Sequence, residues 1–124
     1  MRSTLLLFAL ATACAPALAL DCKNAMNTPE MNECAALEQK AVEAKLNQVY
    51  RRVIKSLDTN EDSAAAKEKL VIAQRAWIKF READCDAVYE NWAGGTIRNV
   101  MYSGCMRQHA EQRIKDLEGF EGGH

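Results

Sequence analysis

Four cysteines and two histidines are the residues of this chain with the most definite chemistry. Beyond residue 19 they are Cys22, Cys34, Cys85, Cys105, His109 and His124. Thiolate and imidazole groups can together bind zinc in a tetrahedral site. However, the cysteines show neither the C-x-x-C spacing of many zinc sites nor the C-x-x-C-H motif of attached haem. We therefore predict two disulfides, with no metal and no cofactor.

The first nineteen residues have the pattern of an export signal. Arg2 precedes the apolar run 5–11, and Ala17-Leu18-Ala19 is an A-x-A cleavage site. The run is too short to span a bilayer, which takes about 20 apolar residues. We predict a signal peptide over 1–19 and a periplasmic or secreted chain. The alternative is a lipoprotein anchored through Cys14, because residues 11–14 loosely resemble a lipoprotein cleavage box.

The charge balance argues against a nucleic acid or an anionic membrane surface as partner. The chain has 16 Lys and Arg against 17 Asp and Glu. Removal of Arg2 leaves 15 against 17, a net charge of −2, whereas both partners need a basic excess. Residues 20–118 suffice for one modest domain, and the glycine-rich residues 119–124 predict a flexible tail.

Residues suited to catalysis are too sparse to predict an enzyme. A hydrolase needs a nucleophile with a base, or two convergent carboxylates. His109 has charged neighbours and fits a solvated helix face, and the acidic residues between Glu82 and Glu90 spread around a helix. We therefore expect a binding protein.

Apolar periodicity predicts three helices. The first covers about Pro29–Leu57, with Thr28 as its cap, and the second runs from Asp62 or Ser63 to about Asn91. Gly94-Gly95 provides a reversal with positive φ, and Thr96 can cap a third helix reaching Leu117. The expected inward residues of the second helix are Ala66, Leu70, Ala73, Trp77 and Phe80. Short turns between three helices predict an all-α, antiparallel three-helix bundle.

This bundle would bring the cysteines to one level. Cys34 and Cys85 lie 26 and 25 residues from residue 60, and Cys85 and Cys105 each lie ten residues from Gly95. Two disulfides would therefore staple the bundle near one end. We favour Cys22–Cys34 with Cys85–Cys105, and the alternative is Cys34–Cys85 with Cys22–Cys105.

The second turn is the best candidate for recognition of a partner. It concentrates aromatic and polar groups, and binding hot spots favour Trp, Tyr and Arg. The candidate residues are Tyr89, Asn91, Trp92, Gly94, Gly95 and Thr96, together with Arg75 and Arg81. In the alternative interpretation Tyr89 and Trp92 seal the end of the bundle, and the arginines pair with acids on other helices.

An ordered set of short motifs runs through the chain after the signal peptide. They are Asp21-Cys22, residues 30–35, 46–50 and 73–81, Cys85, residues 94–96, Cys105 and Gln112-Arg113. This set resembles the lysozyme inhibitor LprI-like family of exported bacterial proteins. The resemblance implies binding to lysozyme and supplies no catalytic residues. An inhibitor could present a basic or aromatic finger to the carboxylate-lined cleft of a lysozyme. The alternative function is that of an envelope structural or interaction protein.

Overall fold

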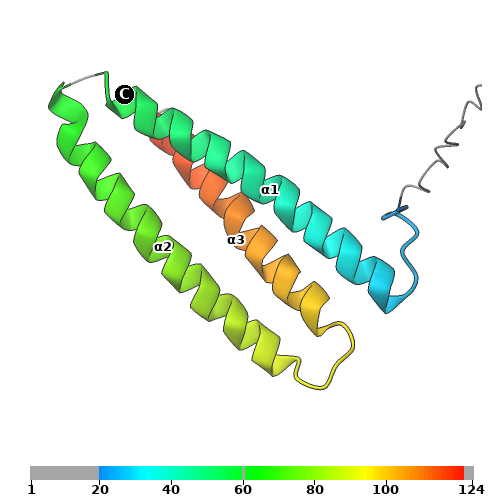
Figure 1. Ribbon diagram of the computed structural model, residues 1–124. Helices are drawn as coiled ribbons and strands as arrows, with labels where there is room; N and C mark the ends of the chain where they lie inside the picture. Colours follow the sequence, from blue (N-terminus) through cyan, green and yellow to red (C-terminus); the bar gives the residue numbers. More distant parts are fainter. Residues whose placement is uncertain (1–19, 60, 122–124) are drawn as a thin grey trace, which may run out of the picture.

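The computed structural model describes residues 20–59 and 61–121, which form three long helices and a short 3-10 turn. Helix α1 covers Thr28–Leu57, η1 covers Glu61–Ser63, α2 covers Ala64–Asn91 and α3 covers Arg98–Glu121. Figure 1 shows α2 running antiparallel to α1 and α3, which lie side by side. The described chain contains no strand, and the prediction of an all-α three-helix bundle is confirmed. The predicted signal peptide and Cys14 lie outside the described residues.

Helix α1 begins one residue earlier than predicted. Asn27 is its cap, with extended backbone, and its side chain accepts a hydrogen bond from the Glu30 amide at 2.9 Å. The Glu30 carboxylate accepts one in return from the Met26 amide at 3.1 Å. Thr28, the predicted cap, is therefore the first helical residue, because the Asn27 side chain already satisfies the exposed amide.

The apolar core lies mainly between α1 and α3. Its buried members are Leu46, Val49, Val53, Leu57, Leu70, Ala110, Ile114 and Leu117. Only Leu70 comes from α2, so that helix contributes little apolar burial to the main core. The Cys85–Cys105 disulfide and the polar contacts of α2 must therefore supply much of what holds it in place.

The inward face of α2 differs from the predicted one. Leu70 is buried and Trp77 partly buried, as expected, but Ala73 is exposed and Phe80 is 61% exposed. The buried positions beside them are Gln74 and Arg81, one residue further along the chain. Apolar periodicity alone missed them, because a polar side chain can be buried where a partner satisfies it.

Two disulfides close the end of the bundle near the α2–α3 turn. Cys22 bonds to Cys34 with a Cα–Cα distance of 5.5 Å, and Cys85 bonds to Cys105 with one of 5.6 Å. This is the favoured pairing of the two that the sequence left open. One bridge ties the N-terminal arm to α1, and the other joins α2 to α3.

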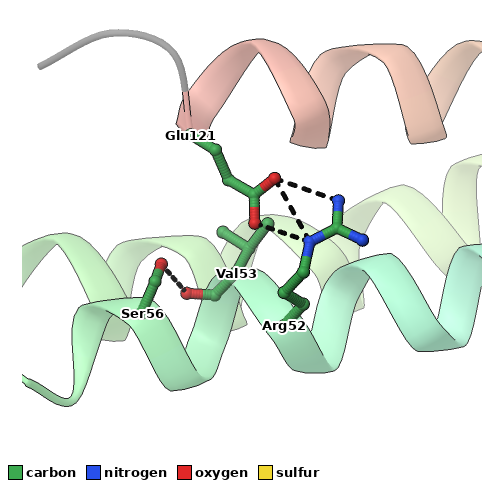
Figure 2. A network of polar contacts seen from close by, with 4 residues as sticks. All are labelled: Arg52, Val53, Ser56 and Glu121. Carbon is green, nitrogen blue, oxygen red and sulfur yellow. Dashed lines mark hydrogen bonds and ion pairs between the residues drawn. The ribbon is translucent and has the colours of Figure 1, made fainter.

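Ion pairs hold the opposite end. The Arg52 guanidinium donates hydrogen bonds from Nε and Nη2 to the Glu121 carboxylate, each at 3.0 Å to its nearer oxygen (Figure 2). This contact holds the pKa of Glu121 below its usual range and raises that of Arg52. Asp58 also pairs with Lys67 across the α1–α2 connection. Helix α3 therefore continues through Gly119 to Glu121, past the predicted start of the flexible tail.

Candidate functional site

The α2–α3 turn reverses the chain within a few residues. The Trp92 amide donates to the Val88 carbonyl at 3.2 Å, and the Gly95 amide donates to the Trp92 carbonyl at 3.0 Å. Gly94 adopts the predicted positive φ, at 81°. Gly95 does not, but a Cβ there would lie 3.2 Å from the Trp92 carbonyl oxygen. One glycine therefore provides the reversal and the other provides room for it.

Arg98 braces this turn from the start of α3. Its Nε donates to the Tyr89 carbonyl at 2.7 Å, and its Nη2 lies 2.8 Å from a Glu90 carboxylate oxygen. The guanidinium carbon sits 3.6 Å from the centre of the Tyr89 ring, which also meets Tyr102 edge-on at 5.8 Å between centroids. Sequence reasoning missed Arg98. The available signal was an arginine within one helical turn of a reversal that carries Tyr89 and Glu90.

Of the predicted recognition residues in the turn, some are held by contacts with neighbouring side chains and others are exposed to solvent. Tyr89 is half-buried and held on two sides, so it stabilises the turn. Asn91, Trp92 and Thr96 are exposed, and the Trp92 residue retains 37% of its accessible surface. The turn therefore offers one large aromatic ring beside two polar side chains, on a backbone fixed by a disulfide and an arginine.

The two predicted arginines lie away from this turn. Arg81 is only 7% exposed, forms an ion pair with Glu43 of α1, and stacks 4.5 Å from the centre of the Trp77 ring. The prediction that Arg81 contacts a partner is thus not supported, because the residue is buried and its charge is paired with Glu43 of α1. Arg75 is exposed, but it lies 17 residues before Trp92, about 25 Å along the helix.

A buried polar cluster extends from Arg81 to α3. The Arg113 Nε donates to the Gln74 side-chain oxygen at 2.9 Å, and its guanidinium carbon lies 5.8 Å from the Trp77 ring centre. Trp77 therefore lies near two arginines from different helices, which is favourable for an aromatic ring with a negative face. These residues come from the motifs 73–81 and Gln112-Arg113, so both motifs have a structural role in the bundle.

A shallow groove between α2 and α3 contains the histidine that sequence reasoning assigned to a solvated face. His109 Nε2 lies 2.7 Å from an Asp84 carboxylate oxygen, and its ring meets Phe80 edge-on at 5.7 Å. An Asp–His pair is the orienting half of a catalytic triad. The described residues around the pair in this groove are Gln108, Glu111, Gln112 and Lys115, and they offer no hydroxyl or thiol nucleophile.

The same histidine approaches the second disulfide. The ligand atoms of Cys85, Cys105 and His109 lie within 4.8 Å of one another, as three zinc ligands would. Both sulfurs are bonded to each other, however, and a disulfide presents no thiolate to a metal. While the chain is oxidised, the closeness of these three groups therefore reflects a disulfide with a histidine beside it.

The fold and the turn together define a class: a small, disulfide-stapled helical domain with a rigid aromatic turn. None of its described helices is long and apolar enough to cross a membrane. The family model for the lysozyme inhibitor LprI matches residues 21–117. This chain belongs to the lysozyme inhibitor LprI family.

Two known proteins illustrate the breadth of this family. An uncharacterized protein of Rhizobium meliloti is 31% identical over 106 residues, covering 79% of this chain and 76% of that protein. The crystal structure of a DUF1311 family protein from Pseudomonas putida KT2440 superposes with a TM-score of 0.70. It is 21% identical and covers 79% of this chain and 100% of that one, which shows a shared fold.

Proposed function

We propose that this chain is an exported inhibitor that binds a lysozyme-type muramidase through the α2–α3 turn. The observation that carries the proposal is Trp92, a half-exposed aromatic ring on a turn that is braced from both sides. Family membership supports lysozyme as the partner.

Rigidity is what makes this turn suited to binding. A loop that is already ordered loses little conformational entropy on association, so more of the contact energy remains as affinity. The Cys85–Cys105 bridge begins one helical turn before Tyr89, and Arg98 closes the other side. The backbone that carries Trp92 is therefore ordered before any partner arrives.

The chemistry of the turn also fits a muramidase cleft. Such a cleft binds a sugar polymer between two carboxyl groups. The Asn91 amide and the Thr96 hydroxyl are exposed beside Trp92 and can donate hydrogen bonds to carboxylates. Trp92 offers a flat apolar surface to the part of the cleft that holds sugar rings.

The test is inhibition of cell-wall lysis by purified, oxidised protein. We expect wild-type protein to slow lysis by lysozyme in proportion to dose, and Trp92→Ala to weaken inhibition about 30-fold, as for a hot-spot residue. Phe120→Ala is the matched control, because Phe120 is 38% exposed and lies at the other end of the bundle. No inhibition of several lysozyme classes at micromolar protein would remove the proposal.

We further propose a periplasmic or secreted location, with the cytosol excluded by the need to maintain two disulfides. Intact mass of protein recovered from the envelope tests this: cleavage after residue 19 with four oxidised cysteines is expected. A lipid mass on Cys14 would favour the anchored alternative, and four free thiols would contradict both.

A further inference from the structure

Helix α2 has a second apolar face outside the core that it shares with α1 and α3, and Phe80, at one edge of this face, also meets the His109 ring of α3. Ile72 is 51% exposed and Phe80 61% exposed. Exposed residues at helical spacings of three and four continue this face in both directions. We call it the outward row: Ala65, Lys69, Ile72, Ala76, Phe80, Ala83 and Ala87. Seven positions with this spacing form one straight seam along a helix, of the kind that packs against another helix.

The charges of α2 are separated along its length. Residues 64–81 contain five basic residues and one acid, whereas residues 82–91 contain four acids and no base. Four of these charges flank the outward row on one side: Arg75, Lys79, Glu82 and Asp86. In the described part of the chain, none of these four side chains makes a hydrogen bond or an ion pair.

This separation is unfavourable in an isolated molecule. Arg75 and Lys79 are like charges four residues apart, as are Glu82 and Asp86, and such pairs destabilise a helix. This cost falls if an oppositely charged surface lies against this side of α2.

We propose that the outward row is the contact face of a two-fold symmetric dimer, in which α2 packs antiparallel to α2 of a second copy. Counted from Phe80, the row has members four and eight residues earlier and three and seven residues later, so its spacing is nearly symmetric. With the two-fold axis beside that residue, Phe80 meets its own counterpart, Ala76 meets Ala83 of the second copy, and Ile72 meets Ala87. Ile72, the other large apolar side chain of the row, thus faces an alanine, which lets the two helices approach closely there.

The same axis brings the unpaired charges together. In an antiparallel helix pair, each flank meets the same flank of the other helix. Arg75 then lies beside Asp86 of the second copy, and Lys79 lies beside its Glu82. Two-fold symmetry repeats both pairs, so four ion pairs form. In a parallel arrangement each flank would meet the opposite flank of the other helix, so these four charges would not pair with one another, which favours the antiparallel dimer.

The length of the helix sets the expected strength. With the two-fold axis beside Phe80, residues 69–91 of the two copies overlap over about 34 Å, and a contact strip about 11 Å wide covers roughly 380 Å² on each copy. The total of roughly 760 Å² lies below the roughly 1,000 Å² that marks the lower end of specific interfaces. The dimer should therefore be weak and dependent on concentration, with dissociation in the micromolar range.

Sedimentation equilibrium of the oxidised chain tests the proposal, and it is independent of lysozyme inhibition. The double variant Arg75→Glu with Lys79→Glu should weaken dimerisation about tenfold or more, because all four ion pairs become repulsive. Adding Glu82→Lys and Asp86→Arg should restore it to about the wild-type value, since every pair is then reversed. Lys40→Glu with Lys45→Glu on α1 makes the same charge change elsewhere and should have no effect.

Two further measurements fix the apolar contact and its register. Phe80→Glu should abolish dimerisation, whereas Leu37→Glu on α1, where the leucine is 49% exposed, should not. Chains carrying Ala76→Cys should cross-link to chains carrying Ala83→Cys, and neither should cross-link to itself. Circular dichroism and intact mass confirm that each variant is folded with both native disulfides.

Several results would overturn the proposal. The proposal is wrong if wild-type protein stays monomeric up to millimolar concentration, even if α2 then proves to bind another protein. Failure of the fourfold charge reversal to restore association also overturns it, as does self-linking of Ala76→Cys at the rate of the mixed pair.

Discussion

Removal of the Cys85–Cys105 bridge should be the most damaging change that leaves the apolar core intact. The bridge closes a loop of 20 residues, and restriction of the unfolded chain by a loop of that length contributes about 3.3 kcal/mol. The Cys22–Cys34 bridge closes 12 residues, which gives about 2.8 kcal/mol by the same relation. Loop length alone therefore separates the two by only about 0.5 kcal/mol.

The structure predicts a larger difference. Cys85 is fully buried on α2, and that helix contributes one residue, Leu70, to the main apolar core. Cys22 is exposed on the N-terminal arm, outside the three helices. Replacing both cysteines of a bridge by alanine should therefore cost about 4 kcal/mol at Cys85–Cys105 and about 3 kcal/mol at Cys22–Cys34.

Urea unfolding of the two double-alanine variants provides the assay, followed by circular dichroism and tryptophan fluorescence. Trp77 and Trp92 both lie on or next to α2, so fluorescence reports on that helix directly. Loss of Cys85–Cys105 should also weaken lysozyme inhibition, because the turn is no longer fixed, whereas loss of Cys22–Cys34 should not. Equal or smaller destabilisation from loss of Cys85–Cys105 would refute the reasoning and show that α2 is held by packing.

Three other outcomes are expected. Arg81→Ala should lower the free energy of unfolding by about 2–3 kcal/mol, because it leaves the Glu43 carboxylate unpaired and removes the stack on Trp77. Glu43→Gln should lower it by less, and the same urea titration measures both variants. Gly94→Ala should lower the free energy of unfolding by about 1 kcal/mol, because φ is positive at that residue. Gly119→Ala should raise it, because Gly119 lies inside α3 and a Cβ there would meet open space. Arg52 lowers the pKa of Glu121, so the stability from this pair is complete above the usual glutamate pKa and is lost as pH falls through the lowered value. The amide protection factors in the last turn of α3, which correct exchange for its intrinsic pH dependence, should therefore fall with acidification, and Glu121→Gln should remove that dependence.

The helices were predictable because they depend on short-range rules, and the same rules placed the cysteines at one level but left two pairings open. Pro29 near a helix start, Gly94 at a reversal and apolar residues at helical spacing each limit the backbone locally. Antiparallel packing then follows from short connections, and it places Cys85 and Cys105 at one height. No long-range interaction had to be known for this step.

The candidate site was predictable only in part. Trp92 lies exposed on the turn, where its sequence position put it, but the role of Arg98 depends on how α3 returns beside α2. Arg81 shows the opposite error: an arginine suggests a surface, yet here Glu43 and Trp77 compensate the cost of its burial. Phe80 suggests a core, yet it lies on the outward row.

The amino-acid sequence by itself determined the number of helices and their order, since backbone preference and chain distance decide both, and it left two disulfide pairings open. Only the tertiary structure decided which polar side chains are buried and which apolar ones are exposed. The reason is that burial of Arg81 or exposure of Phe80 depends on the residues that a neighbouring helix places opposite them, and that information is absent from any single helical segment.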